Sequence, residues 1–164
     1  MMTDFAKLMN DYFVKYLAGQ KGSGSNTMKT YRDTFVQLLE FMDEKKHIRA
    51  DCIEVDSFSY DIINEFLEYL EKEKGVSIST RNNRLAAIRS FFKYTGYHEP
   101  KYLNISASIR EISKKKTEGR QMNYLSVNAM EHFLNSFDKT DHKELRCFCI
   151  VLLLYESGAR VTEL

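Results

Sequence analysis

The chain has little of the two residues that most often interrupt helices. Its 164 residues include one proline and seven glycines, and long stretches carry no turn signal. Because proline and glycine end helices and open turns, their scarcity argues against a protein of many short strands. The hydrophobic content of 43% is enough for a packed core. The composition therefore predicts an all-α fold.

Cysteine and histidine are too few and too scattered for a disulfide framework or a metal centre. Cys52, Cys147 and Cys149 form no Cys-x-x-Cys pair, and the four histidines lie in four separate segments. An odd number of cysteines in apolar surroundings is typical of buried free thiols. We therefore expect three buried thiols and no metal site.

Long apolar runs and a secretion signal are missing as well. The longest unbroken apolar run, Ile150 to Tyr155, is far shorter than the roughly 20 residues that cross a bilayer. The first residues place Asp4 and Asp11 among spaced apolar side chains, where a signal peptide has a basic start and an apolar block. We therefore expect a cytoplasmic protein that makes no contact with a membrane.

The net charge is only +1, but the basic residues are not spread evenly. Residues 72–120 carry 12 basic and 4 acidic side chains, a net charge of +8, whereas residues 1–71 carry 8 basic and 13 acidic ones. A basic block of this kind indicates a polyanionic partner.

Apolar periodicity predicts four helices in the first two-thirds of the chain. Short connections between them favour a compact bundle. The expected ranges are residues 3–18, 26–45, 60–74 and 79–95, with N-caps at Asn26 or Thr27 and at Ser79 or Thr80, and an end before Gly96.

The periodicity is lost over residues 113–123, which predicts a linker. Beyond it, Ser126 begins a helix, and a very apolar helix follows from about Lys143 to Ser157. We therefore expect a helical domain over residues 1–112 and the start of a second domain over residues 124–164.

One face of the fourth predicted helix is polar and basic. It lies opposite the apolar face that carries Leu85 and Ile88. Arg81 and Arg84 add charge in the first two turns, where helix amides attract phosphate. The members of the polar face are Asn82, Ala86, Arg89 and Lys93. Basic and amide side chains contact phosphates and base edges in DNA, so this face favours nucleic acid over the alternative of an ordinary solvated surface.

The last residues, 151–164, form an apolar stretch that breaks at Gly158 and continues through Arg160 and Glu163. This Gly-x-Arg-x-x-Glu-Leu pattern resembles the first catalytic box of the tyrosine recombinases, the phage-integrase and Xer-like DNA strand-exchange enzymes. The resemblance implies that Arg160 grips the scissile phosphate with support from Glu163. A guanidinium suits this task because it stays charged and offers a planar fork of donors. The alternative is a glycine-capped helix end followed by an exposed arginine.

Two further stretches carry the resemblance. Residues 79–94 are similar to the last long helix of the family's core-binding domain, and residues 27–41 to its opening helix. In the family these two helices lie on the DNA duplex. The resemblance implies a four-helix, SAM-like core-binding bundle, then a linker and the first helices of an incomplete catalytic domain that begins at Leu125 and Ser126. The DNA-binding residues that it implies are Thr27, Lys29, Thr30, Thr80, Arg81, Asn82, Arg84 and Arg89, to which helix spacing adds Lys93.

In the implied mechanism a tyrosine attacks a backbone phosphate and forms a covalent phosphotyrosyl link, without a metal or nucleotide cofactor. The family's later His-x-x-Arg box does not occur in this sequence, and none of the ten tyrosines follows such a box. We therefore assign no nucleophile, and we expect the chain by itself to bind DNA without cleaving it.

The partners that we expect are double-stranded DNA and other recombinase subunits in a synaptic complex. The apolar face of the last predicted helix also predicts self-association, or folding back onto the bundle. Two alternatives stay open. One is a non-catalytic helical DNA-binding module or regulator, in which Arg160 has no catalytic task, and the other is a helical protein-interaction domain without a nucleic-acid role.

Overall fold

A computed structural model of the chain describes residues 2–117 and 124–163. These residues contain helices and irregular segments, and no strand occurs among them. The predicted all-α fold class is thereby confirmed. The chain divides into an N-terminal unit, Met1–Glu118, and a C-terminal unit, Gly119–Leu164. Residues 118–123 of the predicted linker lie outside the described part of the chain.

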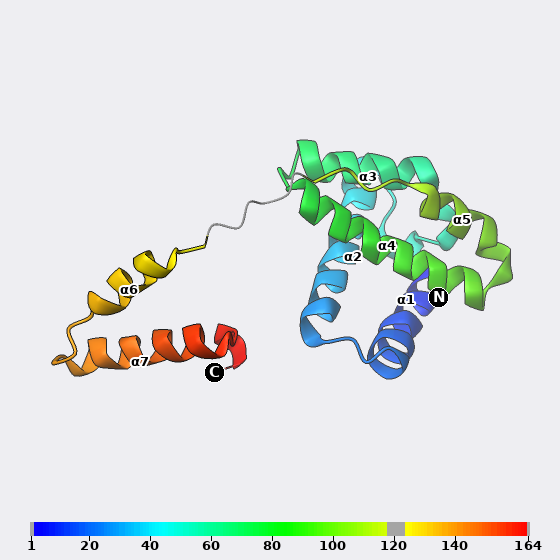
Figure 1. The fold of residues 1–164 in the computed structure, drawn as a ribbon. Helices are drawn as coiled ribbons and strands as arrows, with labels where there is room; N and C mark the ends of the chain where they lie inside the picture. The colour runs from blue at the N-terminus through cyan, green and yellow to red at the C-terminus, as the bar shows by residue number, and fades with distance from the viewer. Residues whose placement is uncertain (1, 118–123, 164) are drawn as a thin grey trace. The chain divides into compact units, whose positions relative to one another are not determined.

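The N-terminal unit is a bundle of helices (Figure 1), several of which begin at a hydroxyl side chain. The side-chain oxygens of Thr3, Ser59 and Ser77 each accept a hydrogen bond from a backbone N–H of the first turn, which satisfies a donor that the helix itself leaves unpaired. The helices are α1 (Asp4–Asp11), η1 (Tyr12–Gln20), α2 (Ser25–Lys46), α3 (Tyr60–Lys72), α4 (Ile78–His98) and α5 (Leu103–Glu111), with 3-10 turns η2 (Ala50–Cys52), η3 (Val55–Ser57) and η4 (Pro100–Tyr102).

The first predicted helix is two joined helices in the structure. α1 continues into η1, a π-helical stretch in which the Lys21 N–H donates to the Tyr16 carbonyl oxygen five residues earlier. Residues five apart share a face in such a helix, and Tyr12 and Leu17 are both fully buried. The second predicted helix begins slightly earlier than expected, with Gly24 as its N-cap.

Both ends of α4 differ from the prediction. Its N-cap is Ser77, whose Oγ accepts from the Thr80 N–H at 3.2 Å. At the other end, the helix continues past Gly96 to His98, and this glycine is buried against α5. A Cβ at Gly96 would lie 2.9 Å from the Ser106 Cβ. The glycine therefore permits a close approach of two helices, one of which, α5, was not predicted at all.

The core of the N-terminal unit is built around the apolar face of α4. Phe91 of α4 is fully buried. Its ring centroid lies 5.3–5.5 Å from four other aromatic rings, which are typical distances for edge-to-face packing. This leaves the opposite face of α4 for the polar contacts described below. The four rings are those of Phe5, Tyr12, Phe35 and Phe92.

The C-terminal unit consists of α6 (Val127–Asn135), α7 (His142–Ser157) and the turn η5 (Val161–Glu163). Ser126 caps α6, as predicted. Gly158 ends α7 in the left-handed conformation at φ 64°, which glycine adopts without strain. The Phe137 ring lies 5.2 Å from that of Phe133 and 6.2 Å from that of Phe148. No residue of this unit's described part is buried.

The prediction of buried thiols is wrong. Cys52, Cys147 and Cys149 are free and exposed. Cys52 ends a turn between α2 and α3, outside the apolar faces of both helices, and the other two lie on α7, whose unit is too small to enclose them. Apolar neighbours in the sequence therefore did not indicate burial.

Candidate nucleic-acid interface

An open groove of about 480 Å³ lies between the end of η1, the polar face of α4, and the end of α5 with the segment that follows it. Five cationic side chains from separate stretches of the chain line it, and none of its described lining residues is acidic. Within residues 2–117 and 124–163, none of the five forms an ion pair. Such a concentration of uncompensated charge attracts polyanions. The lining residues are Lys21, Arg89, Lys93, Arg110 and Lys114, with Tyr16, Ala86 and Ser90.

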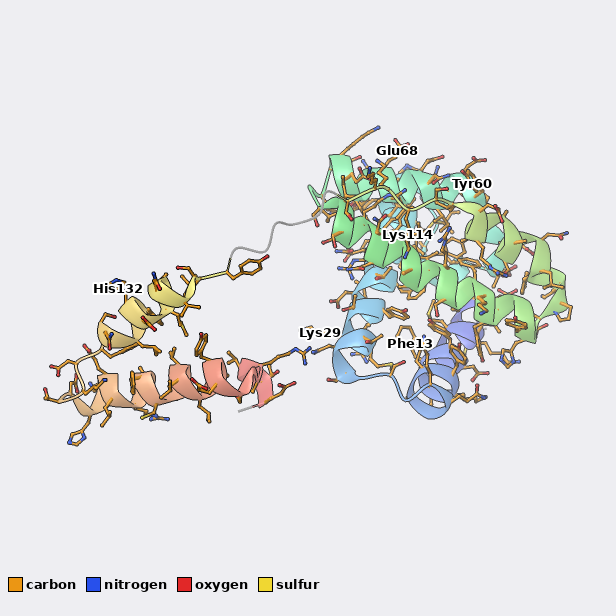
Figure 2. All side chains as sticks on the ribbon, viewed as in Figure 1. Phe13, Lys29, Tyr60, Glu68, Lys114 and His132 are labelled. Atoms are coloured by element: carbon orange, nitrogen blue, oxygen red, sulfur yellow. The ribbon has the colours of Figure 1, made fainter. Side chains whose placement is uncertain are left out.

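The groove takes its shape from residue spacing on α4. Arg89 and Lys93 lie four residues apart and therefore on one face, and Ala86, one turn earlier, adds no side chain beyond its Cβ. Lys21 comes from the end of η1. Lys114 belongs to the segment that follows α5 and runs back along α4, where Figure 2 labels it. Arg89 and Lys93 of the predicted DNA-binding set thus lie together.

Arg81, also predicted to face DNA, is engaged inside the protein. Its side chain is 7% exposed, and its Nε lies 3.0 Å from Oε1 of Glu71 on α3. The pair is ionic, without the alignment of a hydrogen bond. Arg81 Nη1 also donates to the Ser113 carbonyl oxygen at 3.2 Å. These contacts join α3, α4 and the segment after α5.

Arg84 joins α4 to α2. Its Nη1 donates to the Thr30 carbonyl oxygen at 2.8 Å and to Oγ1 of the buried Thr34 at 3.2 Å. Thr30 and Arg84, both in the predicted set, are therefore brought together as an interhelical contact. Sequence spacing cannot show whether a polar face meets solvent or a neighbouring helix, and here part of the α4 face meets α2.

Asn82 and Arg89 hold the end of α5 and the backbone after it. Asn82 Nδ2 donates to the Lys115 carbonyl oxygen at 2.8 Å, and the Lys115 N–H donates back to Asn82 Oδ1 at 3.1 Å. Arg89 Nη2 donates to the carbonyl oxygens of Arg110, at 2.6 Å, and Ile112. Arg89 therefore both lines the groove and fastens one of its walls.

The remaining predicted residues do not line the groove. Thr27 and Lys29 are exposed near the start of α2, where Figure 2 labels Lys29. Thr80 Oγ1 lies 3.0 Å from the Ser77 Oγ, within the first turn of α4.

Lys21 and Tyr16 are groove residues that the sequence did not single out. Lys21 lies in the acidic part of the chain, residues 1–71, and the helix before it shows no basic face of the kind found on α4. Only the packing of η1 beside α4 brings it to the groove. Tyr16 is half-buried, packed against the core on one side and lining the groove on the other.

In the C-terminal unit, Arg160 and Glu163, the two residues of the predicted catalytic box, lie together. Arg160 Nη1 is 3.0 Å from Glu163 Oε1, and the Arg160 N–H donates to Glu163 Oε2 at 2.8 Å. The Arg160 side chain is 83% exposed, so its remaining donors face solvent. The carboxylate thus orients a guanidinium that stays open to an anion.

The described residues show neither a metal cluster nor a membrane span. Among residues 2–117 and 124–163, no three histidine, cysteine or acidic side chains are grouped as for a metal ion. Across the same ranges, no helix has the length and apolar character needed to traverse a lipid bilayer.

The fold and the groove define an all-α protein whose helical bundle carries a cationic groove. Residues 11–96 match the family described as phage integrase, N-terminal SAM-like domain, and this match covers more than half of the chain. The chain therefore belongs to the phage-integrase, or tyrosine recombinase, family, as its motifs indicated.

Curated relatives extend the match across both units. The integrase/recombinase y4rC of Sinorhizobium fredii is 28% identical over 97% of this chain and 48% of its own length. The tyrosine recombinase XerD of Vibrio vulnificus is 29% identical over 99% and 50%, and XerC of Natranaerobius thermophilus is 30% identical over 93% and 48%. The chain thus spans about half the length of these relatives. No solved structure matches it significantly.

Proposed function

We propose that this chain is the N-terminal part of a site-specific DNA recombinase or integrase, and that its N-terminal unit binds duplex DNA through the basic groove. The observation that carries the proposal is the groove itself, in which five cations from separate stretches meet without a described carboxylate. Phosphate contacts supply most of the affinity of a protein for a DNA backbone. The names of the relatives support DNA as the substrate.

Within this proposal, residues 1–112 are the core-binding domain and residues 124–164 the start of the catalytic domain. Residues 113–123 connect the two, and the first of them are held on α4 of the core-binding domain. Arg160 would grip the scissile phosphate, and Glu163 would orient it. Preorganised donors of this kind stabilise charge that develops in a transition state. Strand cleavage by a tyrosine, and exchange between several recombinase subunits, would belong to a protein of the relatives' full length.

The exposed apolar side chains of α7 support a partner for this helix. Leu153 is 53% exposed and Tyr155 is 50% exposed. Apolar surface of this kind is commonly covered in the assembled protein. We propose that further catalytic-domain residues or a second subunit cover it.

The test is fluorescence anisotropy of labelled duplex DNA at several salt concentrations. Each phosphate contact adds about 0.9 to the slope of log affinity against log salt, so the triple change Lys21→Ala/Lys93→Ala/Lys114→Ala is expected to lower the slope by between two and three. These lysines are suitable because, unlike Arg81 and Arg84, they do not hold helices together. The matched control, Lys7→Ala/Lys45→Ala/Lys72→Ala, alters the net charge equally at exposed positions outside the groove.

Absence of salt-dependent binding by the unaltered chain would overturn the proposal and favour a protein-interaction domain. Equal losses in the triple variant and its control would show that only net charge matters, and would reject the groove as the site. In a full-length protein, Arg160→Ala separates the recombinase from a non-catalytic DNA-binding module, because only a recombinase would lose strand cleavage while keeping DNA binding.

A further inference from the structure

The end of α5 and the backbone that follows it are fastened to α4. We name residues 110–115, the last two residues of α5 and the four after them, the strap; in Figure 1 it leads from the end of α5 back along α4. Asn82 pairs with both the N–H and the carbonyl oxygen of Lys115, and Arg89 donates to two strap carbonyl oxygens. Ile112 of the strap is 1% exposed. The strap is therefore part of the folded N-terminal unit.

A carboxylate on α3 adds a second fastening. Glu71 Oε2 lies 2.7 Å from Lys115 Nζ of the strap, and Oε1 lies 3.0 Å from Arg81 Nε on α4. Arg81 in turn donates to the Ser113 carbonyl oxygen. The Glu71 side chain is 21% exposed, so these ion pairs are screened less by solvent than pairs on the open surface. Glu71, through the Lys115 side chain, and Arg81 and Asn82, through backbone atoms, thus hold the same short segment.

The position of the strap matters because it supplies one side of the basic groove. Arg110 and Lys114, two of the five groove cations, are strap residues. Glu71, Arg81 and Asn82 do not line the groove themselves. A change in any of these three would alter the shape of the groove only by moving the strap.

We infer that Asn82, Glu71 and Arg81 are positioning residues: by holding the strap on α4, they place Lys114, with Arg110, where phosphates of a bound duplex contact the groove. The inference rests on the proposed function and refines it. It also reverses an ordinary electrostatic expectation. Removal of the Glu71 charge should raise the affinity for a polyanion if charge alone matters, whereas loss of the strap's fastening lowers it.

The first test is a double-mutant cycle in the 164-residue chain, with a short DNA duplex as the probe. Lys114→Ala removes one phosphate contact and is expected to lower affinity about eightfold at 0.1 M salt. Asn82→Ala is expected to produce a loss of up to the same size. The double variant is expected to be no weaker than Lys114→Ala, because Arg89 still holds Arg110 and the two changes therefore remove the same contact, that of Lys114. The matched control is Asn83→Ala, at the adjacent exposed position, and it should bind like the unaltered chain.

If Asn82 touches DNA directly, its effect and that of Lys114 should instead multiply, to a loss of about 60-fold when each single loss is about eightfold. That result would overturn the inference for Asn82. Hydrogen exchange at the Lys115 amide gives a readout independent of DNA: its protection should fall in Asn82→Ala while the thermal unfolding temperature stays unchanged. Unchanged protection would contradict the role of Asn82 as well.

The second test uses Glu71→Gln, with Glu68→Gln as its control. Both substitutions remove one negative charge from α3, but Glu68 is exposed and pairs with Lys72. Glu71→Gln is expected to weaken DNA binding by about twofold or more, which is part of the loss expected when the Lys114 contact is removed completely. Glu68→Gln is expected to leave the affinity unchanged or slightly higher. Equal effects of the two changes would overturn the positioning role of Glu71.

The two proposals fail in different ways. If the unaltered chain binds DNA and Lys114→Ala weakens binding, while Asn82→Ala and Glu71→Gln behave like the unaltered chain, the strap inference is wrong and the proposed function stands. If the unaltered chain shows no salt-dependent binding, both are wrong.

Discussion

The two units of this protein have similar helical patterns but differ in what they bury. In the N-terminal unit, Phe91 is fully buried, whereas in the C-terminal unit Leu153 is 53% exposed. Each lies in the apolar part of a helix. The difference arises because several helices surround α4, while α6 and α7 alone cannot enclose an apolar face. An amphipathic pattern therefore predicts a helix and its inner face, and burial depends on how many elements surround that face.

Arginine side chains show the same contrast. Arg81 and Arg160 each have a carboxylate oxygen 3.0 Å away, but their exposed side-chain fractions are 7% and 83%. The partner of Arg81 is Glu71 on another helix, and the partner of Arg160 is Glu163 only three residues along the chain. Similar ion pairs thus fasten a tertiary structure in one unit and orient a surface group in the other.

Removal of an aromatic ring should give the largest difference in stability loss between the two units. Phe91→Ala leaves a cavity among four aromatic rings and is expected to lower the free energy of unfolding by about 3–5 kcal/mol. Phe148→Ala is expected to cost about 1 kcal/mol or less, because its ring is only half-buried. Urea denaturation followed by circular dichroism measures both. A comparable loss for Phe148→Ala would indicate that α7 is packed against another surface in solution.

A methyl group added at a glycine should have a smaller effect. In Gly96→Ala the new Cβ meets Ser106 at 2.9 Å, and the separation of α4 and α5 is expected to cost about 1–3 kcal/mol of global stability. In Gly158→Ala the residue would hold φ 64° in open space, which costs about 1 kcal/mol at the end of α7 alone. Thermal unfolding should reveal the first change, and loss of amide protection confined to the end of α7 the second. Global destabilisation by Gly158→Ala would contradict this distinction.

Acidic pH should have the smallest effect on stability, and this effect should also differ between the two units. Burial acts to raise the pKa of Asp4, but hydrogen bonds from the Tyr102 hydroxyl and the Val55 N–H, with the charge of Lys101, hold that pKa below 3.8. The folded state therefore favours the charged carboxylate. The stabilisation that Asp4 contributes is complete above the pKa of the unfolded state, and it is lost as the pH falls through the lower pKa of the folded state.

Asp4→Asn should therefore cost about 1–2 kcal/mol at pH 7 and flatten the loss of stability below about pH 4. Asp138 is the control. Hydrogen bonds from the Thr140 side chain and backbone also lower its pKa, but they lie within one turn, so Asp138→Asn should leave the urea midpoint of the N-terminal unit unchanged at every pH. An unchanged pH profile in Asp4→Asn would show that this carboxylate does not link α1 to the rest of the unit.

The sequence predicted the helices well because their signals are local. Apolar spacing located α2, α3 and α7 to within a few residues, and Ser126 and Gly158 acted as the expected caps. The predictions failed where the partner of a residue is distant in sequence. Gly96 was taken as a helix end because the close approach of Ser106 was unknown. The cysteine prediction failed for a related reason, since apolar sequence neighbours do not enclose a thiol.

The candidate site divides in the same way. The motifs indicated the family, and the spacing on α4 placed Arg89 and Lys93 on one face, where the structure has both in the groove. The sequence could not distinguish these residues from Arg81 and Arg84, because all four carry similar charge on the same helix. Whether they bind DNA stays a prediction for the experiments above.

By itself, the sequence determined the helical fold class, the family and the position of a strongly basic stretch, because periodicity, caps and motifs depend on residues close together in the chain. The tertiary structure alone decided which basic residues line the groove. Lys21 reaches it from an acidic part of the chain, and the strap carries Lys114 to it, while Arg81 turns inward to Glu71. The physical reason is that a charge acts through its distance and exposure in space, and these are set by packing between elements that are far apart in sequence.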